Sequence, residues 1–152
     1  MKSAQITGLE LMRMAMKLPG DMGGRGIASV IPMKITEADE GRVVFVAKAD
    51  DRHTNPLGAV HGGFAATVLD SATGCAVHTL LPAGVGYGTV DLNVKMVRPV
   101  PKDEELLAVG EVIDRTKTTA ISKATLTNRE GKIYAYATAT CRILGRNPPE
   151  IK

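Results

Sequence analysis

The chain has 152 residues, which is enough to bury the core of one domain. Its 19 Lys and Arg residues against 16 Asp and Glu residues give a formal net charge of +3, and this near balance argues against nucleic-acid binding. The two cysteines, Cys75 and Cys141, lie in apolar segments and lack metal-ligand spacing. We therefore expect one domain with reduced thiols, no metal site and a cytoplasmic location.

An amphipathic helix is predicted from Ser3 to Leu18, where apolar side chains recur at roughly helical spacing. The charged residues between them argue against a signal peptide, and no apolar run reaches the roughly 18 residues that a membrane span needs. Residues 19–26 are rich in glycine and form a connector that could cover a ligand site. Residues 1–26 are thus expected to be a helix and a connector, and residues 27–152 a single domain.

Two strands and a long helix are predicted next. The strands cover residues 27–38 and 41–49, with a tight turn at Glu40-Gly41 between them. Residues 64–81 are apolar or small on every side, which is typical of a helix enclosed by other structure. Asp70 is the only charged residue in this segment, and a carboxylate buried in such a helix is costly unless it is paired or used.

Four strands are predicted after the helix. Residues 89–97 alternate strictly, which indicates a half-buried strand with Val90, Leu92, Val94 and Met96 on one face. β-Branched residues indicate three more strands, over residues 105–113, 118–127 and 132–144. Consecutive strands around one long helix favour an α+β fold in which an antiparallel sheet wraps the central helix. Its strand edges suggest pairing between subunits.

Several motifs along this pattern carry a family resemblance. They are Asn55-Pro-Leu-Gly-Ala-Val-His61-Gly62-Gly63, the acid Asp70, Thr89-Val-Asp-Leu-Asn93, Arg98-Pro99 and Lys117-Thr118-Thr119. With them, the chain from about Ile31 to Leu144 resembles the hotdog-fold acyl-CoA thioesterases, in particular the PaaI-like branch of the 4-hydroxybenzoyl-CoA thioesterase superfamily. The resemblance implies a hotdog fold and hydrolysis of an acyl-CoA thioester to a free acid and CoA, without a cofactor.

The start of the predicted helix suits the chemistry of a thioester. The carbonyl becomes an oxyanion under attack, and the first turn of a helix offers unpaired N–H groups and the positive end of the helix dipole. Gly62 lets a carbonyl oxygen approach its amide because it has no Cβ. The resemblance implies that this amide polarises the carbonyl, that Asn55 donates a second hydrogen bond or shapes the loop, and that His61 braces the turn.

Asp70 is the candidate that activates water as a general base or attacks the thioester as a nucleophile, and the sequence leaves both open. The resemblance implies that Thr89 helps to hold the water. Along an α-helix Gly62 and Asp70 lie about 12 Å apart, which is too far for both to act on one carbonyl. We therefore predict a homodimer with two shared active sites, each joining Gly62 and Asn55 of one chain to Asp70 and Thr89 of the other. A further pairing into a dimer of dimers stays open.

Each of these residues also has a purely structural interpretation. Asp70 could bond to neighbouring backbone or to a polar partner across an interface. The pair Gly62-Gly63 could serve close packing at a helix entry, and Asn55 could only form a turn. His61 could cap the helix or contact the substrate, and Thr89 could be an ordinary strand residue.

Basic and hydroxyl side chains in the later strands are candidates for holding coenzyme A, which carries phosphates. The resemblance favours the turn around Lys117, Thr118 and Thr119 for the pantetheine or nucleotide part. Gly63 and Arg98 complete the candidate substrate-binding residues. His53 and His78 lie in no motif, so they receive no role.

Two other functions match parts of the pattern. A hotdog hydratase or dehydratase would need an acid and a catalytic His close together, but the one histidine near Asp70, His61, belongs to the glycine motif. A noncatalytic acyl-CoA binding protein would use the same cavity and normally carries an attached regulatory domain. The acyl group itself stays open, with aryl and medium-chain groups both allowed.

Overall fold

The structure, a computed structural model, describes residues 5–146, without the side chains of Met22 and Arg146. In this part of the chain the elements are α1 (Gly8–Ala15), β1 (Met33–Asp39), β2 (Arg42–Lys48), α2 (Gly62–His78), β3 (Val85–Met96), β4 (Glu105–Arg115), β5 (Thr119–Thr127) and β6 (Ile133–Arg146). Short 3-10 helices lie in the connections: η1 (Met22–Gly24), η2 (Gly26–Ser29) and η3 (Asp51–His53).

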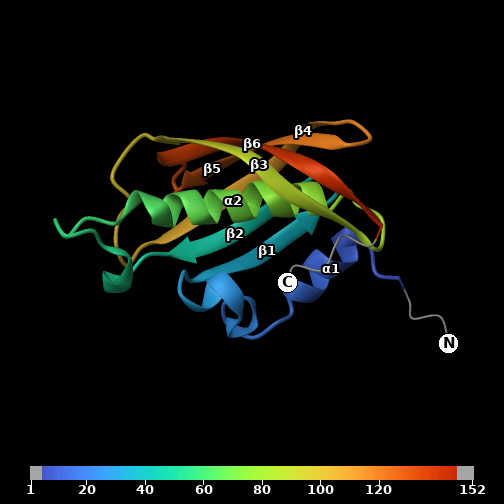
Figure 1. The fold of residues 1–152 in the computed structure, drawn as a ribbon. Helices are drawn as coiled ribbons and strands as arrows, with labels where there is room; N and C mark the ends of the chain where they lie inside the picture. Colours follow the sequence, from blue (N-terminus) through green and yellow to red (C-terminus); the bar gives the residue numbers. More distant parts are fainter. Residues whose placement is uncertain (1–4, 147–152) are drawn as a thin grey trace.

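The strands form one antiparallel sheet in the order β1-β2-β4-β5-β6-β3. The sheet wraps around α2, which contacts strands from β2 to β6, while α1 packs beside β1 (Figure 1). This arrangement confirms the predicted α+β fold with an antiparallel sheet around a long central helix. None of the helices in the described residues is long and apolar enough to cross a membrane.

Small residues let α2 lie close to the sheet. The helix places Phe64, Val68 and Leu69 in the core, and β4, β5 and β6 present buried alanines such as Ala108 and Ala124 beside larger side chains. At Gly110 of β4 the approach is closest, because a Cβ there would overlap the backbone carbonyl of Ala72. The helix and the sheet are therefore in contact through backbone as well as side chains, which fixes the position of α2 tightly.

The N-terminal part departs from the sequence prediction in two places. The helix begins later than expected because Thr7 and Glu10 form a capping box at the start of α1, and it ends earlier, at Ala15. Ser3, the predicted start, lies outside the described residues. The predicted strand from residue 27 is also wrong in its first part, where the chain forms η2 and β1 begins only at Met33.

The strand β3 is an edge strand, and a bulge interrupts its predicted alternation. The register against β6 shifts between Thr89 and Asp91. As a result Thr89 lies opposite the buried Cys141 and points toward α2, whereas Val90 is 64% exposed. The prediction that Val90 shares the buried face with Leu92 and Val94 is therefore wrong.

One side of α2 stays open beside β3. The partly exposed positions Gly63, Ala66, Thr67, Asp70 and Ser71 recur every three or four residues and so share one helix face. This open face corrects the expectation that Asp70 is enclosed, because the carboxylate lies at a partly exposed position within the single chain. The candidate site is built along this face.

Candidate active site

The start of α2 is held by His61, which is the N-cap residue. Its backbone is extended, and its Nδ1 accepts a hydrogen bond from the Gly63 amide at 2.8 Å. Its carbonyl accepts from the Phe64 amide at 3.0 Å. Since Nδ1 is an acceptor here, the geometry corresponds to the bracing role predicted for His61.

The amide of Gly62 remains available in the first turn. His61 uses the neighbouring Gly63 amide, and no acceptor within residues 5–146 pairs with the Gly62 N–H. A Cβ at Gly62 would lie 3.2 Å from the Cε of Met96, so the approach to this amide is narrow. An exposed N–H at the positive end of a 17-residue helix is a suitable donor for an oxyanion.

Asn55 shapes the loop that leads into α2. Its Oδ1 accepts hydrogen bonds from the amides of Leu57 at 2.9 Å and Ala59 at 3.2 Å. The backbone N–H of Asn55 donates to the Ala59 carbonyl at 2.7 Å. The side-chain oxygen is thus used within the turn, and a hydrogen bond to a substrate would have to come from the side-chain NH₂ group.

Asp70 and Thr89 form a pair on the open face of α2. The Thr89 hydroxyl donates to Asp70 Oδ1 at 3.0 Å, and the Cys141 thiol lies 3.9 Å from the same hydroxyl. The other carboxylate oxygen, Oδ2, makes no hydrogen bond within the described part of the chain. The pair therefore presents one oriented and one available carboxylate oxygen.

The core side of this pair is apolar. Burial raises the pKa of the Cys75 thiol to about 12, and it also raises the pKa values of Tyr87 and Cys141. Tyr87 packs so closely on α2 that a Cβ at Gly74 would lie 2.8 Å from its hydroxyl. These groups are neutral at physiological pH, which leaves Asp70 as the one charged side chain on α2.

The predicted site residues fall into two groups. Asn55, His61, Gly62 and Gly63 gather at the start of α2, and Asp70 with Thr89 lies two turns further along. At about 1.5 Å per residue, the eight steps from Gly62 to Asp70 correspond to about 12 Å. Within one chain these groups do not meet.

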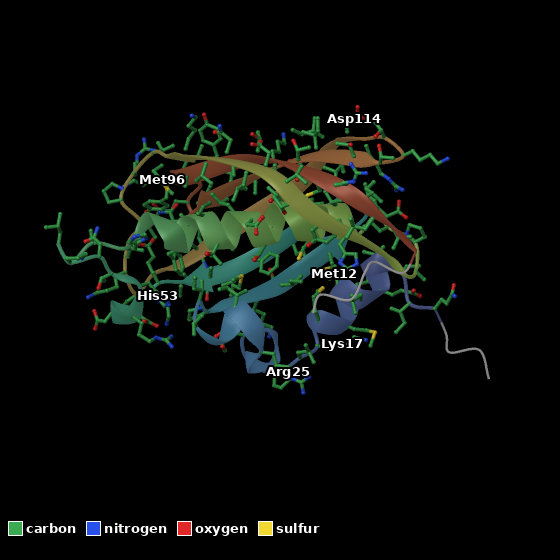
Figure 2. All side chains as sticks on the ribbon, viewed as in Figure 1. Met12, Lys17, Arg25, His53, Met96 and Asp114 are labelled. Carbon is green, nitrogen blue, oxygen red and sulfur yellow. The ribbon has the colours of Figure 1, made fainter. Side chains whose placement is uncertain are left out.

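The predicted substrate-binding residues are divided between the same two regions. Arg98 lines a cavity of about 390 Å³ together with Gly62 and Met96, and its Nη1 donates to the Ile133 carbonyl at 2.7 Å. Lys117 and Thr118 belong to the β4–β5 turn and Thr119 is the first residue of β5, beside the far end of α2. Figure 2 shows this separation, with Met96 near the start of α2 and Asp114, just before the turn, near the other end.

Strand pairing nevertheless places the turn around Lys117 on the same side of the molecule as Asp70. Thr119 on β5 pairs with Arg142 on β6, and Arg142 pairs with Gly88, the neighbour of Thr89. Lys117, Thr118 and Thr119 are thus on the Asp70 side of the molecule, and Arg98 is on the Gly62 side.

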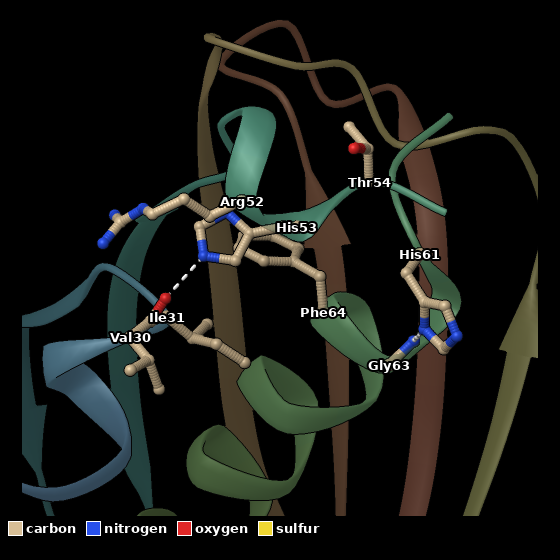
Figure 3. A pocket seen from close by; sticks show the side chains of 8 residues that line it. All are labelled: Val30, Ile31, Arg52, His53, Thr54, His61, Gly63 and Phe64. Carbon is tan, nitrogen blue, oxygen red and sulfur yellow. Dashed lines mark hydrogen bonds between the residues drawn. The ribbon is translucent and has the colours of Figure 1, made fainter. Parts of the chain in front are cut away.

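A second cavity, of about 480 Å³, opens beside the start of α2 and was not predicted. His61, Gly63 and Phe64 line it from the start of α2, and residues 30–31 line it from the opposite side (Figure 3). Residues 52–54 also line it, and their backbone lies next to His61, whose amide donates to the His53 carbonyl at 2.7 Å. His53 is central to it: Nδ1 accepts from the Asp50 amide at 2.9 Å and Nε2 donates to the Val30 carbonyl at 2.5 Å. The signal in the sequence was the spacing of Asp50 and His53, which form a capping box around η3.

Comparisons with known proteins identify the family of the chain. A family model described as the thioesterase superfamily matches residues 57–135. Acyl-coenzyme A thioesterase 13 of Mus musculus is 30% identical over 132 residues, covering 86% of this chain and 90% of the relative.

Two solved structures share the fold. A hypothetical thioesterase protein with coenzyme A from Streptococcus pneumoniae has a TM-score of 0.69 at 27% identity and covers 76% of this chain and 91% of its own. The PaaI protein of E. coli, from the phenylacetic acid degradation operon, has a TM-score of 0.75 at 20% identity. The match covers 82% of this chain and 88% of the PaaI chain, and at this identity it shows the fold alone. The resemblance to the hotdog-fold thioesterases drawn from the motifs is confirmed: the chain belongs to the thioesterase superfamily, has the hotdog fold and is a thioesterase.

Proposed function

We propose that this thioesterase hydrolyses acyl-CoA thioesters and releases a free acid and CoA. The observation that carries the proposal is the unpaired Gly62 amide at the start of α2 together with the Asp70–Thr89 pair on the open face of the same helix. These groups supply a donor for the developing oxyanion and a carboxylate for the attack. The names of the Mus musculus relative and of the Streptococcus pneumoniae structure, which contains coenzyme A, support the same substrate.

In the proposed reaction, the thioester carbonyl oxygen accepts a hydrogen bond from Gly62. If Asp70 is a general base, it takes a proton from a water whose oxygen bonds to the carbonyl carbon. The carbon–sulfur bond then breaks, and the departing sulfur takes the proton from Asp70, so that CoA leaves as the thiol. If Asp70 is a nucleophile, its oxygen bonds to the carbonyl carbon, the carbon–sulfur bond breaks and CoA leaves, and water then hydrolyses the resulting mixed anhydride to the free acid. In both cases the Thr89 hydroxyl orients the carboxylate through Oδ1. Oδ2 takes the proton from the water in the first route and attacks the carbonyl carbon in the second.

The proposed site needs two copies of the chain. The spacing of Gly62 and Asp70 supports this, because one carbonyl cannot reach both within a single chain. The edge strand β3 is free to pair, and it carries the exposed side chains of Val90 and Met96 beside the open face of α2. A two-fold pairing along this edge gives two equivalent sites, each with Gly62 of one copy and Asp70 of the other. Further pairing of dimers stays open.

The same pairing supports a role for the predicted basic residues. Arg98 lies on the Gly62 side and the turn around Lys117 on the Asp70 side, so residues from both copies flank one shared site. We infer that they bind the phosphates of CoA, because guanidinium and ammonium groups pair with phosphate oxygens. A cytoplasmic location stays a prediction, based on two free thiols, Cys75 and Cys141.

The test is release of CoA thiol from a panel of acyl-CoA esters by the wild type and by Asp70→Asn. We expect the wild type to release thiol and the folded variant to lose at least about a hundredfold in kcat, as for removal of a general base or nucleophile. Asp39→Asn is the matched control, because it makes the same change at an exposed position on β1, at the opposite edge of the sheet.

Two results would contradict the proposal. If the wild type releases no thiol from any acyl-CoA ester, CoA esters are not its substrate. If Asp70→Asn has the same activity as Asp39→Asn, Asp70 is neither the general base nor the nucleophile.

A further inference from the structure

We propose that the cavity of about 480 Å³ beside the start of α2 holds the acyl group, and that it selects acyl chains without a hydroxyl or a charge. This inference rests on the proposed hydrolysis of acyl-CoA and adds the chemical class of the acyl group. His61 and Gly63, which flank Gly62 in the sequence, line one end of the cavity. An acyl chain whose carbonyl lies at the Gly62 amide therefore begins at this end (Figure 3).

The surfaces that the chain would contact are apolar. Phe64 is 2% exposed and stacks beside the His53 ring, with the two ring centroids 5.3 Å apart. Ile31 is partly buried against the core, and Val30 is 54% exposed at the edge of the cavity. An acyl chain laid along these residues removes apolar surface from water on both sides, which favours its binding.

Most hydrogen-bonding atoms of the polar side chains in the cavity are already paired within the chain; among residues 5–146 the exceptions are Arg52 Nη1 and His61 Nε2. Arg52 donates through Nε and Nη2 to the carboxylate of Asp50, at 3.0 and 2.8 Å. Both ring nitrogens of His53 are used, one by the Asp50 amide and the other by the Val30 carbonyl. The Thr54 hydroxyl donates to the Asp51 carbonyl at 2.9 Å. His61 is exposed and lies at the thioester end, away from the tail of the chain.

An acyl chain with a polar end would lose hydrogen bonds to water. The donors without a partner among the described residues are Arg52 Nη1, on a guanidinium that is 59% exposed, and His61 Nε2 at the thioester end, so the apolar part of the cavity offers none. A carboxylate would in addition meet a guanidinium whose charge is neutralised by Asp50. Pockets of this kind discriminate against an added hydroxyl by on the order of tenfold to a hundredfold. The cavity should therefore favour unsubstituted chains by at least about tenfold in kcat/KM.

The first test compares three esters of equal chain length: octanoyl-CoA, 8-hydroxyoctanoyl-CoA and the mono-CoA ester of octanedioic acid. We expect kcat/KM to be highest for octanoyl-CoA. In Val30→Lys, an ammonium group at the cavity edge gives the terminal carboxylate a partner, so the preference for octanoyl-CoA over the octanedioyl ester should fall at least about tenfold. Ile113→Lys adds the same charge at an exposed position on β4 outside the cavity, and it should leave the ratio unchanged.

Equal rates for the three esters, or equal effects of Val30→Lys and Ile113→Lys, would overturn the inference and leave the proposed hydrolysis intact. Binding of non-hydrolysable thioethers, S-octyl-CoA and S-(8-hydroxyoctyl)-CoA, separates the opposite case. If no ester is hydrolysed but the protein binds the octyl thioether at least about tenfold more tightly, the proposed reaction fails and the apolar cavity stands. If no ester is hydrolysed and the two thioethers bind equally, both fail.

Discussion

The Gly62 amide is a single N–H group, so its role can be tested by removing that group alone. Gly62 is the first residue of α2, a position where proline is favoured, and His61 has φ −65 and ψ 137, which a residue before proline readily adopts. Gly62→Pro should therefore fold and lose about a hundredfold in kcat, as for loss of an oxyanion donor. Gly62→Ala keeps the N–H and adds a Cβ near the flexible Met96 side chain, so it should lose much less. Equal kcat values for the two variants in a thiol-release assay would show that the Gly62 N–H does not act as an oxyanion donor.

Individual residues of the motif were predictable where local backbone decides their contacts. His61 caps α2 and Asn55 closes its turn through hydrogen bonds to residues at most four positions away. Thr89 is different. Strict alternation predicts it on the polar face of its strand, but in the structure a bulge turns its side chain toward Asp70. A bulge depends on the pairing with β6, which one strand's sequence does not contain. His53 was assigned no role, although its bonds to Val30 and Asp50 fix one side of the cavity.

The contact between α2 and the sheet depends on a glycine in β4. Gly110→Ala would place a Cβ against the Ala72 backbone, which cannot move like the end of a side chain. We expect a loss of about 2 kcal/mol in the free energy of unfolding, as for overpacking a core. Gly145→Ala, in β6, meets no atom within 4 Å and should change stability by less than about 1 kcal/mol. Urea unfolding followed by circular dichroism measures both, and equal midpoints would show that α2 does not sit where the structure places it.

The order of the elements followed from hydrophobic periodicity, and one of the errors, at the start of β1, shows the limit of that signal. The predicted strand from residue 27 has β-branched and apolar residues, but Gly26 has a positive φ of 60° and residues 26–29 turn into η2. Apolar content does not distinguish an extended segment from a short 3-10 turn that packs on the same core. Ala28 is buried in that turn, so the side chain reaches the core without a strand.

The whole fold controls the reactivity of the two thiols. Cys141 is fully buried, and burial raises the pKa of Cys75 from 9.0 to about 12. At pH 8 this shift lowers the thiolate fraction of Cys75 about a thousandfold, and thiolate is the reactive form. In the folded protein we therefore expect iodoacetamide to leave both thiols unmodified over minutes, and in denaturant to modify both. Fast labelling of Cys75 in the folded state, read by mass spectrometry, would contradict this environment.

The two halves of the proposed site meet only in an assembly of two chains, and this is the central claim for the whole molecule. One half contains the Gly62 amide, and the other contains Asp70 and its partner Thr89 on β3. Along α2, Asp70 lies about 12 Å from Gly62. Two inactive variants, Asp70→Asn and Gly62→Pro, should therefore complement each other. A mixed dimer has one site with both changes and one site with neither.

The most direct measurement is thiol release from an acyl-CoA ester by Asp70→Asn and Gly62→Pro chains after they are unfolded together in equal amounts and refolded. Random pairing makes half of the dimers mixed, with one intact site in two, so we expect about a quarter of the wild-type activity. Each variant refolded alone should stay at its own low level. A co-refolded sample no more active than the average of the two variants, with mixed dimers shown by two affinity tags, would contradict a site shared between chains.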